Sequence, residues 1–509
     1  MKKRLLSVVL AVCLIISGLA LFAGCSDNGG GGTEPPPDTA MEYAEWLLRN
    51  MKSSYKMSAW LKYEEDERYP YLGGESEEIG TSYTALVKNS GNDRVSTVYS
   101  ATYDYNLPYQ DRLISETKAE FIKSGENYEK KLYIDRKKSV VTTELTANAF
   151  ADEASEFLLP EALLAVAIKG GEANITLRRN QAPDKYYEDG RWPSEEELKK
   201  FTILSFAGYS NYESNSDYTW FFLDFVVYEN KLDVIMCQKS GKVNNVSYRH
   251  TGAISMNDIE SGAEEPFRKT DYYASEEACA TEMLNGVFDN QPERYRVAVT
   301  ETVTMGTTTN PSHSYYIAYE KAGDTEYFYE KSTSAGEWRI EESYTRNGNG
   351  HIGRKYNTGD MTYREKVCDE HLCFYEGENL SETELYVGQH AYINVMNTSF
   401  LSMAQMLSAV QYAEVDFEGN VCTITINLPS GQEGVDEQVI FVIEGTVLKK
   451  FSVVQTIDSF PDISEMPDMP SIPGMPDLTG STVITKTTST FTYDTAAIGA
   501  DLSGYTRAE

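Results

Sequence analysis

The chain has 509 residues, of which 41% are hydrophobic and 24% charged, a composition typical of a globular rather than a disordered protein. At roughly 100–200 residues per domain, this length suggests about two to four folded units. The formal net charge of −33 would repel a phosphate backbone, so nucleic acid is excluded as a partner. The 36 tyrosines suit the strands of large sheets with one face exposed to solvent, because a tyrosine ring packs while its hydroxyl stays hydrated.

The N-terminus has the pattern of an export signal. Residues 2–4 are basic, residues 5–23 form an almost unbroken apolar run, and a small residue then precedes Cys25. The segment resembles a bacterial lipoprotein signal, whose lipobox ends in a small residue and an invariant cysteine, although Phe22 stands where the family usually has leucine. The resemblance implies that residues 1–24 are removed and that Cys25 becomes the first mature residue, carrying acyl chains such as palmitate.

The segments around this signal predict where the body of the protein lies. The apolar run is also long enough to span a bilayer as an uncleaved helix, which is the alternative to a lipid anchor. Both alternatives place the body outside the cytoplasm, attached to the cell membrane, or to an outer membrane if the host is diderm. Residues 25–39 contain four consecutive glycines and three consecutive prolines, so we expect a tether between the anchor and the body.

Five of the seven cysteines remain when Cys13 and Cys25 are set aside, and an odd number spread over the mature chain is not a disulfide framework. The one local pair in the mature chain is Cys368 and Cys373, in sequence that predicts two strands joined by a four-residue turn. A cross-strand disulfide and two free thiols are both compatible with this spacing. A zinc site that also uses His371 would lack a fourth ligand, so we predict no metal and no cofactor.

One order of predicted elements occurs twice in the body of the chain. Residues 40–258 start with a helix, continue with tyrosine-rich strands, reach a second helix near 150–168 and end with a block of strands. Residues 272–498 repeat this order. The closing hairpins are the closest parallel, with turns at residues 229–230 (Glu-Asn) and 444–445 (Glu-Gly). The sequence therefore predicts two tandem copies of one domain.

The remaining segments connect or end these two domains. Residues 259–271 form an acidic linker, and residues 499–509 a C-terminal tail. Residues 459–480 are rich in proline and methionine; the prolines cannot serve a central strand, and the methionines could bind copper(I), although a loop without a fixed partner is the simpler explanation. We predict that residues 483–493 pair with residues 447–456 across this insertion, because loop-closure cost rises slowly with length.

The element order predicts an α+β fold with two tandem copies of a curved antiparallel sheet. Each sheet would be an unclosed half-barrel with helices packed on its concave face. Over residues 40–498 this order resembles the lipoprotein-carrier fold of the LolA-like proteins and of acylated mycobacterial lipid-binding lipoproteins. In that family the barrel holds acyl chains, so the resemblance implies lipid-binding cavities between sheet and helices.

Apolar side chains on the predicted helices are the candidates to line such cavities. The same side chains could equally form ordinary cores, because flexible methionines and leucines suit both purposes. The candidates are Leu47, Met51, Phe157, Leu158 and Leu164 in the first domain and Met283, Val287, Met396, Phe400, Met403 and Leu407 in the second.

No catalytic motif stands out in the sequence. The five histidines are scattered, and no nucleophile elbow, His-Glu-x-x-His pair or phosphate-binding loop occurs. We therefore predict a non-catalytic, membrane-anchored extracytoplasmic lipoprotein that binds a lipid or other hydrophobic ligand. The alternative is a cell-surface sensor or interaction protein with dry, fully packed cores and a protein partner in the envelope. A solute-binding transporter component is disfavoured, since no alternating βαβ pattern appears.

Overall fold

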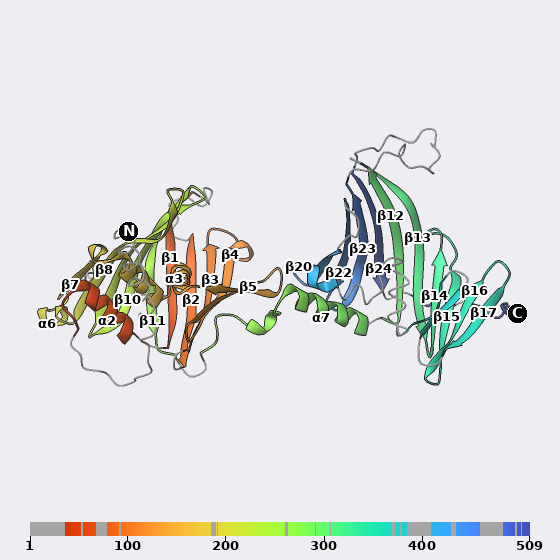
Figure 1. The fold of residues 1–509 in the computed structure, drawn as a ribbon, viewed down its shortest axis with the longest axis horizontal. Coiled ribbons are helices and arrows are strands. Elements are labelled where there is room, and N and C mark those ends of the chain that lie inside the picture. The colour runs from red at the N-terminus through yellow and green to blue at the C-terminus, as the bar shows by residue number, and fades with distance from the viewer. Residues whose placement is uncertain are drawn as a thin grey trace, which may run out of the picture. The chain divides into compact units, whose positions relative to one another are not determined.

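The described residues of the computed structural model fall into two compact units (Figure 1). The first unit is Met1–Ile134 with Val140–Asp271, and the second is Asp135–Ser139 with Tyr272–Glu509. Among the described residues, no helix is both long and apolar enough to cross a membrane. The described residues are 36–51, 54–67, 79–90, 93–184, 190, 192–259, 263–290, 292–305, 307–368, 372–376, 379–383, 409–428, 434–458, 482–493, 496–499 and 501–508.

The first unit is built on an 11-stranded antiparallel sheet. Its strands are β1 (Tyr55–Asp66), β2 (Ile79–Ser90), β3 (Asp93–Asp104), β4 (Leu113–Ser124), β5 (Asn127–Ile134), β6 (Ser139–Leu145), β7 (Ile175–Arg179), β8 (Phe201–Ser214), β9 (Asp217–Tyr228), β10 (Lys231–Val243) and β11 (Val246–Asn257). Their order in the sheet is β6-β5-β4-β3-β2-β1-β11-β10-β9-β8-β7. Two up-and-down runs, β1 to β6 and β7 to β11, are therefore joined by the pairing of β1 with β11.

Short helices begin and divide this unit. They are α2 (Ala40–Asn50), α3 (Ala147–Glu156), α4 (Pro160–Gly170) and α6 (Glu195–Leu198), with 3-10 turns η1 (Tyr109–Asp111) and η2 (Glu172–Asn174). Thr39 caps α2, because its hydroxyl accepts a hydrogen bond from the backbone N–H of Glu42 at 3.3 Å. Pro160 opens α4 at its first turn, where a missing N–H costs nothing, so the helix expected near residues 150–168 is two helices.

The core of the first unit joins these helices to one face of the sheet. Side chains from α2, α3 and α4 contact inward-pointing side chains of the strands in one continuous apolar cluster. Leu163 and Leu164 of α4 and Phe221 of β9 are fully buried in it. Burial of this apolar surface is the main source of stability for a sheet with few long helices.

The second unit repeats the arrangement of strands with a 12-stranded sheet. Its strands are β12 (Arg294–Met305), β13 (Thr308–Ala322), β14 (Thr325–Lys331), β15 (Arg339–Asn347), β16 (Gly350–Asn357), β17 (Thr362–Cys368), β20 (Ala413–Glu418), β21 (Val421–Leu428), β22 (Val435–Glu444), β23 (Val447–Ile457), β24 (Val483–Tyr493) and β25 (Thr506–Arg507). The order is β20-β21-β22-β23-β24-β12-β13-β14-β15-β16-β17-β25, so two runs are joined by the pairing of β24 with β12.

Smaller elements complete the second unit. The helix α7 (Glu276–Asp289) is capped by Ser275, whose hydroxyl accepts from the N–H of Ala278 at 3.1 Å. Cys279, Leu284 and other side chains of α7 lie in a core with strands β20 to β23. The remaining elements of this unit are the two-stranded sheet of β18 (Leu372–Glu376) and β19 (Asn379–Thr383) and the 3-10 turn η4 (Val410–Tyr412), whereas the 3-10 turn η3 (Lys269–Asp271) ends the first unit.

The closing hairpins agree with the sequence. Strand β24 pairs antiparallel with β23 from Ile457↔Val483 to Lys450↔Thr490, which confirms the pairing predicted across the insertion. The first closing turn has Glu229 and Asn230 at φ 48° and 65°, as a tight type I′ turn requires, and in the second Gly445 has φ 62°. Both turns therefore lie where their residue types predict them.

The predicted α+β class is wrong. Strands far outweigh helices in the described residues, and the protein is mostly β, with two large antiparallel sheets rather than helices packed on a concave face. The reason is size. The 11-residue helices α2 and α4 are each about 16 Å long, whereas 11 strands at about 4.8 Å spacing span roughly 50 Å. The acyl-chain cavities implied by the carrier resemblance would need helices packed on a concave face, so that implication loses its basis with the α+β class.

Candidate functional site

The described candidates for a lipid cavity lie in or against packed cores. None of them lines the pocket of the first unit described below or the shallow pocket beside α7 in the second unit. In the first unit Leu47, Leu158 and Leu164 are buried, and Met51 and Phe157 pack against the same core. In the second unit Val287 is buried and Met283 packs beside it. The other cavity candidates lie outside the described residues; they are Met396, Phe400, Met403 and Leu407. The lipidation candidate Cys25 also lies outside the described residues.

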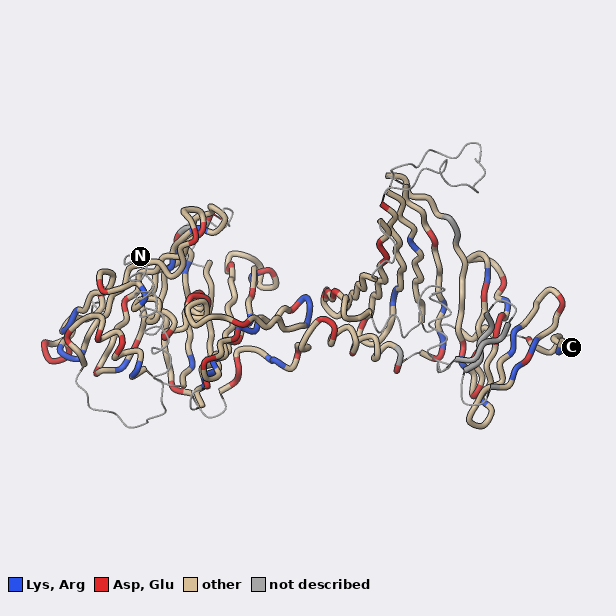
Figure 2. The backbone as a smooth tube through the Cα atoms, viewed as in Figure 1, with Lys and Arg blue, Asp and Glu red and all other residues tan. Residues whose placement is uncertain are grey.

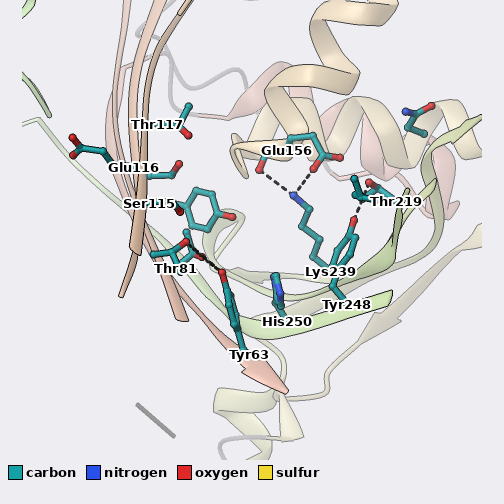
Figure 3. A pocket seen from close by; sticks show the side chains of 15 residues that line it. Tyr63, Thr81, Ser115, Glu116, Thr117, Glu156, Thr219, Lys239, Tyr248 and His250 are labelled. Atoms are coloured by element: carbon teal, nitrogen blue, oxygen red, sulfur yellow. Dashed lines mark hydrogen bonds and ion pairs between the residues drawn. The ribbon is translucent and has the colours of Figure 1, made fainter. Parts of the chain in front are cut away.

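A polar pocket of about 370 Å³ lies in the first unit (Figure 3). Its lining comes from the end of α3 and from eight strands that are consecutive in the sheet, from β4 through β1 and β11 to β8. In a flat sheet the outer two of these strands would lie roughly 34 Å apart, so the sheet must curl for both to line one pocket. The lining residues are Tyr63, Thr81, Tyr83, Ser100, Thr102, Ser115, Glu116, Thr117, Glu156, Asn211, Thr219, Lys239, Val243, Tyr248 and His250.

One wall of the pocket is a connected set of hydroxyl groups. Thr81 of β2 and Thr102 of β3 are register partners, and their Oγ1 atoms lie 2.9 Å apart. The Tyr63 hydroxyl lies 3.2 Å from Thr81 Oγ1 and donates to Thr102 Oγ1 at 3.3 Å. Ser115 of β4 pairs with Thr102 on the other side and continues the row. Three adjacent strands therefore place hydroxyls side by side on one face.

Aromatic rings form a second part of the lining. Tyr63 of β1 and His250 of β11 are register partners, and their rings stack at 4.1 Å with 12° between planes. The ring centroid of Tyr248 lies 5.3 Å from that of His250, and the Tyr248 hydroxyl is 3.0 Å from Thr219 Oγ1 on β9. Gly241 of β10 lies between these two strands, where a Cβ would be 2.1 Å from the Tyr218 carbonyl oxygen and 2.8 Å from the Tyr248 hydroxyl. Glycine at this position lets the neighbouring strand approach and leaves the space that the Tyr248 hydroxyl occupies.

An ion pair closes the pocket beneath α3. Lys239 is the register partner of His250, and its ammonium group contacts the Glu156 carboxylate and the Glu156 carbonyl oxygen, the latter at 3.4 Å (Figure 3). Burial alone would lower the pKa of Lys239, but the charge of Glu156 and those of two neighbouring tyrosines raise it above the ordinary lysine range. Glu156 is the last residue of α3, where the helix dipole also favours a cation.

The charges around the pocket are balanced locally. Glu116 accepts a hydrogen bond from the Tyr99 hydroxyl at 2.9 Å and lies 3.2 Å from the Lys118 ammonium. Burial raises the pKa of Tyr83 to about 12, so its hydroxyl stays protonated. Acidic residues elsewhere are spread over both units rather than gathered in one patch (Figure 2). The lining therefore combines neutral hydroxyls and rings with charges that already have partners.

The described cysteines are chemically quiet. Cys237, Cys279 and Cys422 are buried free thiols. Burial raises the pKa of Cys237 and Cys422 to about 12 and that of Cys279 to about 11, which keeps them protonated and unreactive. The side chains of Cys368 and Cys373 lie outside the described ones, so the disulfide stays a prediction. No group of three or more His, Cys, Asp or Glu within the described residues could hold a metal ion.

Reasoning from sequence missed this pocket, although one signal was present. On β10 the inward positions read Ile235, Cys237, Lys239 and Gly241, so a lysine interrupts an otherwise apolar or small face. The equivalent alternation on β11 turns His250 inward. Polar residues at inward positions of adjacent strands indicate a site, but only the curl of the sheet brings the distant strands to it.

Comparisons with known proteins were made for the whole chain. No family model matches it, and no curated protein matches it. Among solved structures it is similar to a protein of unknown function from the DUF3598 family of Nostoc punctiforme, with 7% identity over 89% of this chain and 99% of that chain and a TM-score of 0.13. A mutant of the vaccine antigen transferrin binding protein B from Haemophilus parasuis gives 7% identity over 86% and 75% of the chains and a TM-score of 0.12. TM-scores this low do not establish a shared fold.

Proposed function

We propose that the protein is a non-catalytic, membrane-anchored extracytoplasmic lipoprotein that binds a small polar ligand in the pocket of its first unit. The pocket carries the proposal. Its volume of about 370 Å³ lies within the roughly 300–1,000 Å³ of small-molecule sites. Each hydroxyl has one donor and two acceptor sites, so the hydroxyl wall keeps hydrogen-bonding capacity beyond the bonds within it and can hold a polar ligand. The lining side chains that are more than nine-tenths buried are Thr81, Tyr83, Thr102, Thr219, Tyr248 and His250.

The same observations disfavour a lipid in this pocket. An acyl chain would cover the hydroxyls of Thr81 and Thr102 without offering them a hydrogen-bond partner. Two of the apolar side chains proposed to hold such a chain, Leu158 and Leu164, are instead fully buried in the core. A binding or sensing protein with packed cores is therefore the function that the first unit supports best.

The pattern of the N-terminus supports the anchor. Replacing Cys25 with serine removes the sulfur atom proposed to carry the thioether-linked lipid, so we expect the protein to be released or left unprocessed. Cell fractionation and the mass of the N-terminal peptide measure this. Cys13→Ser, within the apolar run, is the matched control and should leave anchoring unchanged. A Cys25→Ser protein that is cut and retained on the membrane like the parent would contradict the anchor.

Thermal unfolding of the intact, detergent-solubilised protein tests ligand binding. A ligand that binds the native state alone stabilises it by about 2.7 kcal/mol at one hundred times its dissociation constant. We expect at least one class among sugars, amino acids and nucleosides to raise Tm, and fatty acids to leave it unchanged. Thr102→Val should reduce the shift, whereas Thr309→Val, exposed on β13, should not. A Tm raised by fatty acids alone would overturn the proposal.

A further inference from the structure

The hydroxyl wall of the pocket is two rows deep. One row is Thr81 with its register partner Thr102, and the next row pairs Tyr83 with Ser100. On β4 the rows continue at Ser115 and Thr117, so that three strands each contribute two hydroxyl side chains. A hydroxyl both donates and accepts, and it rotates to suit its partner. Such a wall matches a ligand that carries several hydroxyls of its own.

The aromatic part of the lining offers a complementary surface. Tyr63, His250 and Tyr248 follow one another across β1 and β11, with ring centroids 4.1 Å and 5.3 Å apart. Amphipathic rings of this kind present an apolar body and a polar edge. A molecule with C–H groups on one face and hydroxyls around its rim can use both surfaces at once, whereas a purely polar ion can use only the hydroxyl wall.

The charges of the pocket disfavour ionic ligands. The one cationic side chain in the lining, Lys239, is held by Glu156, and the carboxylate of Glu116 lies 3.2 Å from the Lys118 ammonium. An anion would have to displace Glu156, against the field of a chain with net charge −33. A cation would have to displace Lys239 or Lys118. Both exchanges break an ion pair that an uncharged ligand leaves intact.

We propose that the ligand of this pocket is an uncharged polyhydroxylated molecule, a monosaccharide or the exposed end of a glycan. This inference rests on the proposed binding function of the same pocket and names the ligand class. The sugar ring lies with its C–H face toward Tyr63 and His250 and its hydroxyls toward Thr81 and Thr102. The cavity of about 370 Å³ limits the buried part of the ligand to a small molecule or one end of a longer chain.

Calorimetric titration of the intact lipoprotein tests the ligand class, in a detergent without a sugar headgroup. The probes are neutral mono- and disaccharides, their charged counterparts glucuronate and glucosamine, an amino-acid mixture and a short fatty acid. We expect a neutral sugar to bind and its charged counterparts to bind at least tenfold more weakly. Thr102→Val should weaken sugar binding by about tenfold, because it removes one hydroxyl group while leaving the shape of the side chain nearly unchanged.

Controls make each result decisive. Ser115→Ala changes an exposed hydroxyl at the same wall and should weaken binding without affecting folding, whereas Thr309→Val on the second unit should change nothing. Binding of an amino acid but no sugar, with the same loss in Thr102→Val, would overturn the sugar inference and leave the binding function intact. Binding of the fatty acid alone, unaffected by Thr102→Val and Ser115→Ala, would overturn both.

Discussion

Replacing Leu164 with alanine is expected to lower the free energy of unfolding of the first unit by about 2–5 kcal/mol. Leu164 of α4 has an exposed fraction of 0% and lies in the core shared by three helices and the sheet. The loss combines the transfer free energy of the removed methyl groups with the cost of the cavity they leave. Denaturant unfolding of the intact protein, followed by tryptophan fluorescence, measures it. Four of the five tryptophans report on this unit: Trp46, Trp60, Trp192 and Trp220.

The matched control for this change is Leu107→Ala. Leu107 lies after β3 with an exposed fraction of 38%, so its truncation should alter stability by less than about 0.5 kcal/mol. The comparison separates a filled core from an open cavity. If Leu164→Ala left stability unchanged and altered binding of a hydrophobic ligand instead, Leu164 would line a ligand cavity and the packed core would be wrong.

The second large effect is expected for Lys239→Met, which should lower the free energy of unfolding of the first unit by about 2–4 kcal/mol. Removing one partner of a buried ion pair leaves the other charge uncompensated. The Lys239 side chain is 12% exposed and that of Glu156 37%. Water can therefore solvate the Glu156 carboxylate in part once Lys239 is gone, so the loss of stability should be smaller than for a fully buried pair. The double variant Lys239→Met with Glu156→Gln should recover much of the stability, because no charge then remains unpaired.

A surface ion pair provides the reference for this measurement. Lys200 and Glu229 lie 2.6 Å apart with side chains 44% and 56% exposed, and Lys200→Met should cost less than about 1 kcal/mol. Denaturant unfolding of the three variants gives the comparison. A cost for Lys239→Met no greater than that for Lys200→Met would mean that the pair beneath α3 is solvated like any surface pair.

Local features of the fold could be predicted because short segments determine them. The turns at Glu229-Asn230 and Glu444-Gly445 depend on residues within a few positions of each other. The pairing of residues 483–493 followed from their β-branched content and from the order of the preceding hairpin. These signals need no knowledge of the rest of the chain.

The fold class was mispredicted because periodicity gives the position of a helix and not its share of the architecture. Pro160 illustrates this limit, since it starts a second short helix instead of interrupting a long one. The same limit applies to ligand contacts. Leu158, between α3 and α4, and Leu164 of α4 are both buried, but the pattern could not say whether side chains or a ligand cover them.

The pocket could not be assembled from the sequence because its residues are far apart in the chain. Tyr63 and His250 stack as register partners, yet 186 positions separate them, and most strands contribute only one or two side chains. In the sequence, none of these residues alone can be distinguished from an ordinary strand residue. Only the order of the strands and the curl of the sheet give them a common site.

Native mass spectrometry of the intact protein tests the central claim most directly. The protein, released from membranes into a volatile detergent solution, is mixed with equal amounts of a neutral sugar and a fatty acid. The mass of any adduct then identifies the class of ligand in the pocket. We predict an adduct with the mass of the sugar, less abundant in Thr102→Val than in the parent and equally abundant in Thr309→Val. An adduct with the mass of the fatty acid, equally abundant in parent and Thr102→Val, would contradict a polar binding pocket.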